Sequence, residues 1–174
     1  PDKMLDALYA FTDCEVSLSP NACVILDDKP QFIGVKEILK TSTERTKYLL
    51  GRELEIELGE LQEQWHFSSL EKIFIEKRVY RDIEECETWE EILENIHQGL
   101  KPHIKKLLRE VTDEDVTRLT EIRIKRISKF DSFKADTKIS NLEADIEKVK
   151  HRLENLTDYT IDWFKSLKSK YGKD

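Results

Sequence analysis

Adjacent carboxylates recur along this sequence, for example Glu84-Glu85 and Glu90-Glu91. Two carboxyl groups held together in a cleft can act as general acid and general base. The chain contains 36 acidic residues among 174, so neighbouring carboxylates are also expected on the solvated faces of ordinary helices. We therefore expect these pairs to be helix surface and not a catalytic pair.

Other reactive residue types lack the spacing that a metal site, a phosphate-binding loop or a catalytic nucleophile requires. The cysteines and the four histidines form no C-x-x-C or H-x-x-x-H pair, which argues against a metal site. The five glycines are isolated, so no glycine-rich phosphate loop is expected. No tyrosine has both an arginine and an acidic neighbour in a predicted loop, so all five are expected to pack. We predict no catalytic, cofactor-binding or metal-binding residue among Cys14, Cys23, Cys86, Tyr9, Tyr48, Tyr80, Tyr159 and Tyr171.

Charge is unevenly distributed in this acidic chain of net charge −7. Residues 51–98 include 14 acidic and 5 basic residues, whereas residues 101–129 include 9 basic and 5 acidic ones. The basic stretch has two interpretations: a solvated helical surface, or a surface that lies near DNA. With 37% charged residues, five Gly and four Pro, the composition favours a mainly helical protein.

A regular apolar repeat gives the clearest structural prediction. Apolar residues recur at alternating intervals of three and four, with only Thr160 as a polar intruder, which is typical of a coiled coil. We expect one helix from about Phe133 to Tyr171. The apolar positions of its seam are Ile139, Leu142, Ile146, Val149, Leu153, Leu156, Trp163 and Leu167.

A second, less regular stripe precedes it on a long helical segment that begins at Val35. Gly51 and Gly59 lower helix propensity there, and a bend is predicted near residues 66–69. We expect this stripe to face the first one within the same chain, as an antiparallel arm. Its positions are Leu50, Leu54, Leu58, Leu61 and Trp65.

Shorter elements complete the predicted layout. Residues 1–34 should contain a β-hairpin, with strands near residues 23–26 and 31–33 and a turn at residues 27–30. The outgoing helix should cover residues 35–85 and end near residues 81–86. A helical knob should cover 86–130, with short helices capped at Thr88 and Thr112 and another opening at Lys101-Pro102. The returning helix should cover 131–174.

The surroundings of the protein are also constrained. Three thiols without paired spacing suggest a reducing, cytoplasmic compartment. No apolar run approaches the ~20 residues that would span a bilayer. The chain begins with Pro1, which suggests a piece of a longer polypeptide.

Four segments resemble the breakage-reunion subunit (the A subunit) of the bacterial type II DNA topoisomerases, namely gyrase and topoisomerase IV. Residues 7–17 (ALYAFTDCEVS) are similar to the exit from the tower domain of that family, and residues 34–39 (GVKEIL) to the start of its coiled-coil helix. Residues 111–131 resemble its L-T-(E)-x-Q…D-L-R-L-x-(R/K)-L-T-x-L-E tip, with Ile for Leu at three positions and KFD where GLE is usual. Residues 163–173 (WFKSLKSKYGK) resemble its returning helix, in wording close to a Bacteroidetes-like topoisomerase IV.

The resemblance implies the exit gate of such an enzyme, where two copies meet at the knob and part to release a transported DNA duplex. It implies a homodimer that works with the B subunit and double-stranded DNA, and a cytoplasmic, chromosome-associated location. The catalytic tyrosine would lie upstream, and Mg²⁺ and ATP would bind the B subunit. We expect the dimer interface at Leu119, Ile122, Arg123, Ile124, Arg126, Ile127 and Phe130, although the same residues would also suit internal packing.

Two other classes of protein remain open at this point. One is a free-standing coiled-coil scaffold or adaptor unrelated to DNA enzymes. The other is a small helical enzyme, which the missing site residues disfavour.

Overall fold

The structure is a computed structural model that describes residues 2–17, 22–83 and 86–172. It is mainly helical, as predicted, with one small antiparallel sheet. The chain divides into two compact units, residues 1–46 and 47–174. The long helix α2 (Val35–Glu76) contributes to both units.

The first unit contains helix α1 (Asp2–Phe11) and a hairpin of β1 (Cys23–Leu26) and β2 (Lys29–Phe32). The predicted hairpin is confirmed, with Leu26 paired to Lys29 and Cys23 to Phe32. Its turn is tighter than expected, because Asp27 and Asp28 both have positive φ, as a two-residue type I′ turn requires. The helix α1 was not predicted, and the break expected at residues 19–21 lies outside the described residues.

The helix α2 runs without interruption to Glu76, so the bend predicted near residues 66–69 is wrong. His66, Ser68 and Ser69 are buried against neighbouring elements, and no proline interrupts the ladder. The helix also ends earlier than expected, because Arg78 adopts a left-handed conformation and starts the short 3₁₀ turn η1 (Val79–Arg81). The predicted end at residues 81–86 falls partly outside the described residues.

The returning segment is two helices, α6 (Ser132–Glu154) and α7 (Leu156–Tyr171), and not one. Asn155 separates them with φ −111° and ψ 42°, and its side-chain amide donates to the carbonyl of His151 at 3.0 Å. Asparagine competes with the helix in this way by bonding to nearby backbone groups. The apolar repeat continued through this position and therefore concealed the break.

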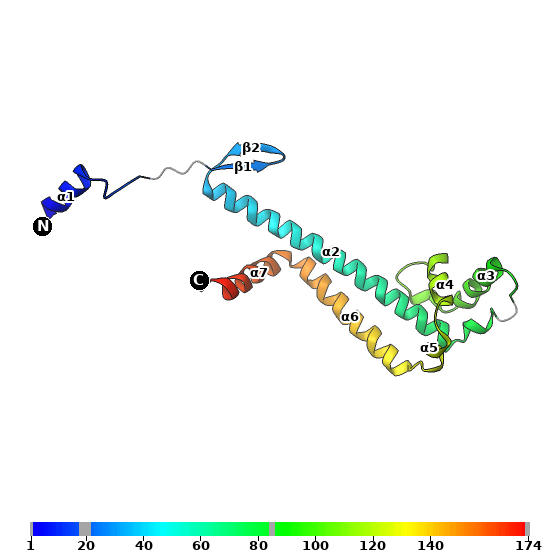
Figure 1. The fold of residues 1–174 in the computed structure, drawn as a ribbon. Helices are drawn as coiled ribbons and strands as arrows, with labels where there is room; N and C mark the ends of the chain where they lie inside the picture. Colours follow the sequence, from blue (N-terminus) through cyan, green and yellow to red (C-terminus); the bar gives the residue numbers. More distant parts are fainter. Residues whose placement is uncertain (1, 18–21, 84–85, 173–174) are drawn as a thin grey trace. The chain divides into compact units, whose positions relative to one another are not determined.

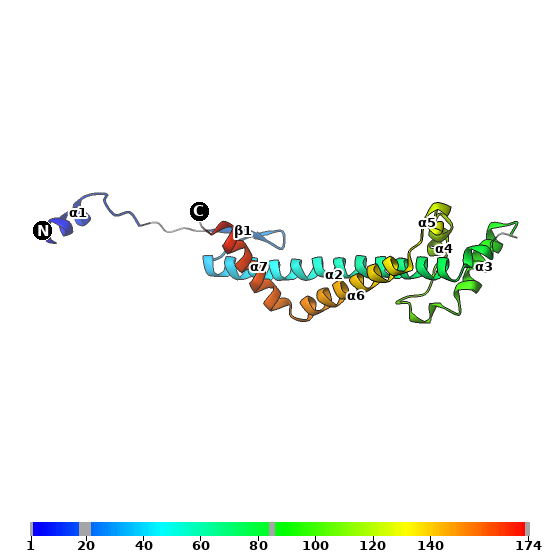
Figure 2. The ribbon, with the colours of Figure 1, turned by 90° about the horizontal axis from the view of Figure 1, so that it is seen from below.

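The helices α2 and α6 lie side by side and antiparallel (Figures 1 and 2). The indole nitrogen of Trp65 donates to Glu143 Oε1 at 3.0 Å, and Ser132 donates to Glu76 near the other end. Eleven residues separate these contacts on each helix, so the register is maintained. Every residue of the two predicted seams is buried or half-buried: Leu50, Leu54, Leu58, Leu61, Trp65, Ile139, Leu142, Ile146, Val149, Leu153, Leu156, Trp163 and Leu167.

Two glycines of α2 differ in their surroundings, and so should the effects of replacing them. A methyl group at Gly59 would meet no atom within 4 Å, whereas one at Gly51 would lie 3.0 Å from Leu156 Cδ2. We expect Gly59→Ala to raise the free energy of unfolding by about 1 kcal/mol through helix propensity. Gly51→Ala should gain less or destabilise, because Leu156 must move. Urea unfolding of both variants checks this, and equal gains would contradict the close approach of α7 to Gly51.

The knob is formed by short elements around the C-terminal part of α2 (Figure 1). Helix α3 (Trp89–Leu100) opens with a capping box between Thr88 and Glu91. Helix α4 (Asp113–Thr120) opens with a second one between Thr112 and Asp115. Both predicted caps are confirmed. The helix expected after Lys101-Pro102 is only the 3₁₀ turn η2 (Ile104–Lys106).

The segment after Thr112 forms two helices where one was expected. Helix α4 ends at Thr120, and α5 (Ile124–Ser128) follows after an extended Arg123 (φ −65°, ψ 138°). Threonine hydroxyls near the end of α4 bond back to the backbone, from Thr117 to Asp113 at 2.8 Å and from Thr120 to Thr117 at 2.7 Å. Such bonds weaken a helix, so a break here fits the local sequence.

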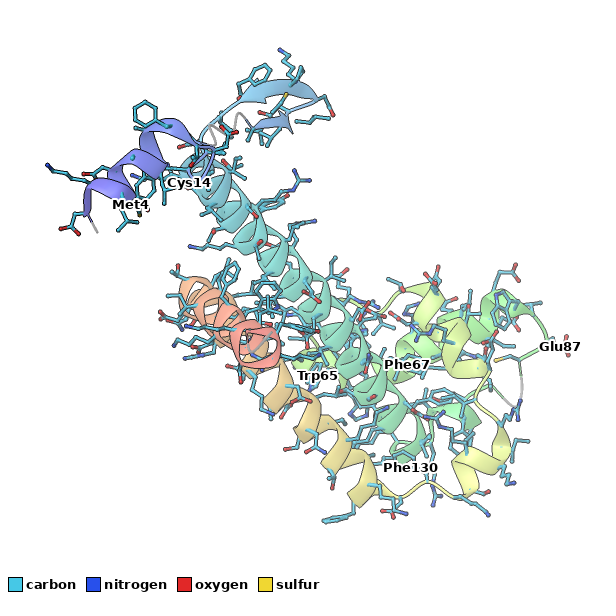
Figure 3. All side chains as sticks on the ribbon, turned by 60° about the vertical axis from the view of Figure 1, so that its left-hand side comes forward. Met4, Cys14, Trp65, Phe67, Glu87 and Phe130 are labelled. Atoms are coloured by element: carbon cyan, nitrogen blue, oxygen red, sulfur yellow. The ribbon has the colours of Figure 1, made fainter. Side chains whose placement is uncertain are left out.

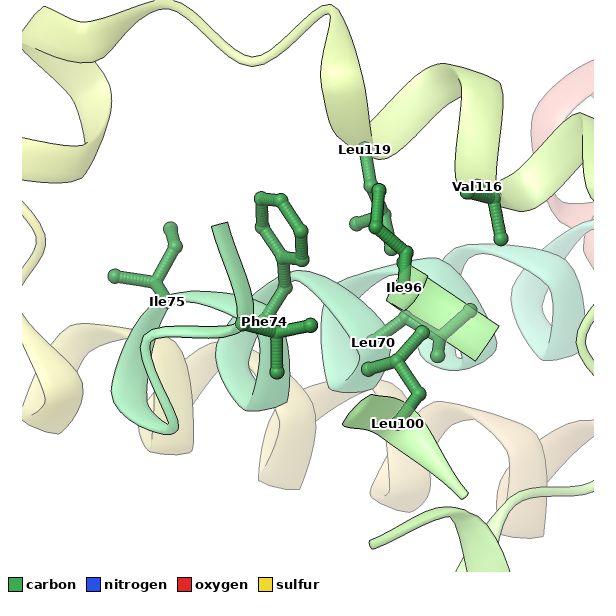
Figure 4. Close-up of a cluster of buried hydrophobic side chains, with 8 residues drawn as sticks. Leu70, Phe74, Ile75, Ile96, Leu100, Val116 and Leu119 are labelled. Atoms are coloured by element: carbon green, nitrogen blue, oxygen red, sulfur yellow. The ribbon is translucent and has the colours of Figure 1, made fainter. Parts of the chain in front are cut away.

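A single apolar core joins the knob to α2. Side chains from α2 and η1 meet side chains from α3 and α4, and Figure 4 shows the cluster. Half-buried residues of α5 and its flanks, including Ile122, Ile127 and Phe130, pack against its edge. The buried members are Leu70, Phe74, Ile75, Val79, Ile96, Leu100, Val116 and Leu119.

Candidate functional site

An apolar surface with an unfilled hollow lies beside α5. The Ile124 side chain is 82% exposed, a high value for isoleucine. Next to it is a hollow of about 400 Å³, open to solvent. The hollow is lined by Phe74, Tyr80, Ile83, Leu119, Thr120, Ile122, Ile124 and Ile127. We call this set the apolar tip.

The residues predicted for the dimer interface have different surroundings in the structure. Leu119 is 1% exposed and belongs to the internal core, so little of its side chain is left for a second chain. Ile122, Ile127 and Phe130 are half-buried, with part of each side chain accessible. The exposed members are Arg123, Ile124 and Arg126. The side chains of this region are drawn in Figure 3, where Phe67 and Phe130 are labelled.

An ion cluster built on the buried Asp115 joins α4 to α2, and few signs of it are visible in the sequence. The guanidinium of Arg109 contacts both carboxylate oxygens of Asp115 at 2.6 and 2.9 Å, and Glu63 of α2 at 2.9–3.2 Å. Asp115 also accepts from the backbone and hydroxyl of Thr112, both at 3.0 Å. The capping-box pattern could have pointed to Asp115, but Arg109 lies in a loop and has no sequence signature.

The cluster determines the charge of its members. Burial alone would raise the pKa of Asp115, but hydrogen bonds from Arg109 and Thr112 outweigh burial and hold that pKa well below its usual range. His66 lies 3.5 Å from Asp115, and neither ring nitrogen has a hydrogen-bond partner within the described residues. Burial and the charge of Arg109 lower the pKa of His66. The cluster is therefore an anionic Asp115 and a cationic Arg109 beside a neutral His66 at pH 7.

Sites of other kinds are missing from the part of the chain that the structure describes. Within residues 2–17, 22–83 and 86–172, no group of three or more His, Cys, Asp or Glu side chains could hold a metal ion. Over the same ranges no helix is both long and apolar enough to cross a membrane. Among the tyrosines, Tyr80 packs edge-to-face against Phe74 at 6.2 Å, and Tyr159 lies beneath the guanidinium of Arg152.

An antiparallel helical arm that ends in a small knob with an exposed apolar tip is the arrangement that the sequence resemblance implied. The sequence model of the family described as the A subunit of DNA gyrase/topoisomerase IV matches residues 1–166. The chain belongs to this family. It is 30% identical over 172 residues to the A subunit of DNA topoisomerase 4 from Borreliella burgdorferi, an alignment that covers 99% of this chain and 28% of that relative.

Membership of this gyrase and topoisomerase IV family confirms the resemblance. It also rules out the interpretation as a scaffold or adaptor unrelated to DNA enzymes. The chain spans about a quarter of the length of the curated relative it matches.

Proposed function

We propose that this chain forms the dimer contact and exit gate of the breakage-reunion subunit of a type II topoisomerase. In this role two copies meet at the apolar tip, hold the enzyme together while DNA is cut elsewhere, and part to release the transported duplex. The observation that carries the proposal is the exposed Ile124 beside an open apolar hollow, in a chain of this family.

A two-fold dimer explains both features together. A two-fold interface is isologous, so one patch must complement itself. Ile124 of one copy can enter the hollow of its partner while the partner does the same in return. Each buried Å² of apolar surface contributes roughly 25 cal/mol, so covering an exposed isoleucine and the hollow wall favours association. Arg123 and Arg126 would lie at the rim of this contact, where charged side chains are common.

The chemical step is assigned to other parts of the enzyme. The catalytic tyrosine is proposed to lie upstream of this chain, and Mg²⁺ and ATP to act on the B subunit. This piece would then cleave no DNA itself. It would contribute a rigid arm, built from α2 and α6, and a reversible contact at the end of that arm. The enzyme would work in the cytoplasm on chromosomal DNA.

Ile124→Asp is expected to weaken self-association at least tenfold while leaving the chain folded. A charge would be buried without a partner in the dimer, whereas in the free chain the same side chain is 82% exposed. Sedimentation velocity across a concentration series measures the association, and circular dichroism monitors helicity. Ile56→Asp is the matched control, because Ile56 is also an exposed isoleucine in a helix, but on α2.

Two results would overturn the dimer proposal. One is a native chain that stays monomeric at tens of micromolar. The other is an Ile124→Asp variant that dimerises as the native chain does. In the complete enzyme, unchanged decatenation by the variant would contradict the gate function in the same way.

A further inference from the structure

We propose that a basic stripe beside α5 binds the phosphate backbone of duplex DNA. The inference rests on the proposed function, because the gate is what brings a duplex to this surface. The stripe consists of the seven cations that line two adjoining hollows: Arg118, Arg123, Lys125, Arg126, Lys129, Lys134 and Lys138.

The two hollows form one continuous surface because they share Arg126 and Lys129. The larger has a volume of about 710 Å³ and adds Arg118, Arg123 and Lys125. The smaller has a volume of about 260 Å³ and extends onto the first turns of α6, where Lys134 and Lys138 lie. The stripe therefore runs from α4, along α5, to α6.

Four of these seven cations form no ion pair with the described part of the chain. Within the described residues, Arg118 pairs with Glu63, Arg126 with the buried Glu71, and Lys134 with Asp131. No carboxylate in that part of the chain is within ion-pair distance of the other four cations. Among the acidic residues lining the hollows, Glu71 is engaged by Arg126 at 2.8 Å, and Asp131 caps α6. Of these acidic lining residues, Glu121 alone has neither role, so it is the one remaining carboxylate that could offset the charge of the stripe.

Such a concentration of positive charge is unexpected in a chain of net charge −7. Cations clustered along one face are the electrostatic signature of a backbone-binding surface, which requires no base-specific contact. Arg118 adds rigidity, because its guanidinium lies 4.1 Å from the centre of the Phe67 ring.

A second copy of this chain is the competing occupant, but the geometry favours DNA. Ile124 and Ile127 line the apolar hollow, whereas Arg123, Lys125 and Arg126 line the basic one. The short helix α5 thus lies between the two surfaces, which meet at Ile122. A partner bound at the apolar tip would reach the stripe only at Arg123 and Arg126, and would leave its other cations available to a passing duplex.

The test measures binding of the 174-residue chain to a fluorescent duplex of two helical turns, about 21 base pairs. The stripe variant carries Lys125→Glu, Lys129→Glu and Lys138→Glu, which break no ion pair within the described residues. Its matched control carries Lys36→Glu, Lys40→Glu and Arg45→Glu on exposed positions of α2, with the same change in net charge. Fluorescence anisotropy gives the affinity, and sedimentation velocity on the same samples gives the oligomeric state.

We expect the stripe variant to bind the duplex at least tenfold more weakly than the control at about 0.1 M salt. The slope of log affinity against log salt should fall by about 0.9 for each phosphate that is no longer neutralised. A variant with Lys125→Gln, Lys129→Gln and Lys138→Gln should give an intermediate result, and it replaces the Glu variant if that variant loses helicity.

Three outcomes would overturn the proposal that the stripe binds duplex DNA. The native chain could fail to bind the duplex at about 50 mM salt, where phosphate contacts are strong. The stripe variant could bind as tightly as the control, with dimerisation intact, which would leave the gate proposal standing. The variant could also lose dimerisation but keep its duplex affinity, which would assign the stripe to contact with a second copy.

Discussion

Phe74→Ala is expected to detach the knob from the arm, lowering the free energy of unfolding by about 3–5 kcal/mol. The Phe74 side chain is 2% exposed and belongs to the core that joins α2 to α3 and α4 (Figure 4). Removing the ring leaves a cavity, because neighbours on three separate elements cannot all move in to fill it. It also removes the edge-to-face contact with Tyr80.

The loss should be concentrated in the knob. The helices α3 and α4 have 12 and 8 residues, lengths at which isolated helices are marginal in water. They therefore depend on the core for their order. The arm has a separate apolar seam between α2 and α6, so it should stay folded longer.

Amide hydrogen exchange distinguishes these two regions. In Phe74→Ala we expect protection to fall in α3 and α4 well before it falls in α6. Phe133→Ala is the control, because Phe133 is 80% exposed, and its removal should cost less than about 0.5 kcal/mol. A uniform loss of protection would show that arm and knob unfold as one unit. A loss below about 1 kcal/mol would contradict the role of Phe74 as a core residue.

The sequence predicted the elements that follow from local rules. The three-and-four spacing indicated an arm, and its seam residues are buried or half-buried in the structure. The helix starts at Thr88 and Thr112 were predicted as caps, because a threonine side chain satisfies backbone groups locally, and in the structure an acidic residue three positions later completes each capping box. The hairpin followed from a polar turn between two strand-like runs, although its turn has two residues where four were expected.

Features that depend on competition between nearly equal conformations were not predicted. The break at Asn155 preserves the apolar repeat, so periodicity alone gives no warning of it. The division between α4 and α5 places Ile124 in solvent and Ile122 against the core. If α4 and α5 formed one continuous helix, as expected from the sequence, Ile122 and Ile124 would face other directions. The interface prediction included Leu119 for the same reason, since sequence cannot tell a buried leucine from an exposed one.

The sequence also did not predict the Arg109 cluster, which joins α2 to α4. Its three charged members come from α2, an irregular segment and α4, which are separated by up to 52 positions. Only the tertiary structure brings them together, and no local rule pairs an arginine in a loop with a carboxylate on a distant helix.

Arg109→Met is expected to lower the free energy of unfolding by about 3 kcal/mol, the lower end of the range for breaking a buried ion pair. The Asp115 side chain is 2% exposed and would keep only its bonds from Thr112. The lower end applies because the Arg109 side chain is 38% exposed, so water can enter when it is removed. Arg118→Met is the control, because the Arg118 and Glu63 side chains are 44% and 45% exposed, and the ion pair and ring contact of Arg118 together contribute about 1 kcal/mol.

Adding Asp115→Asn to Arg109→Met separates the buried charge from the loss of packing. The amide keeps the shape of the carboxylate and can still accept hydrogen bonds from Thr112. It carries no charge that would be left buried without a partner. If the unpaired Asp115 carboxylate causes the loss of stability, the double variant should be more stable than Arg109→Met by about 1–2 kcal/mol. A double-mutant cycle should then show strong coupling between the two positions. Additive losses would instead show that Arg109 acts through its aliphatic stem. In that case the orientation of α4, and with it the position of the apolar tip, would depend on packing and not on charge.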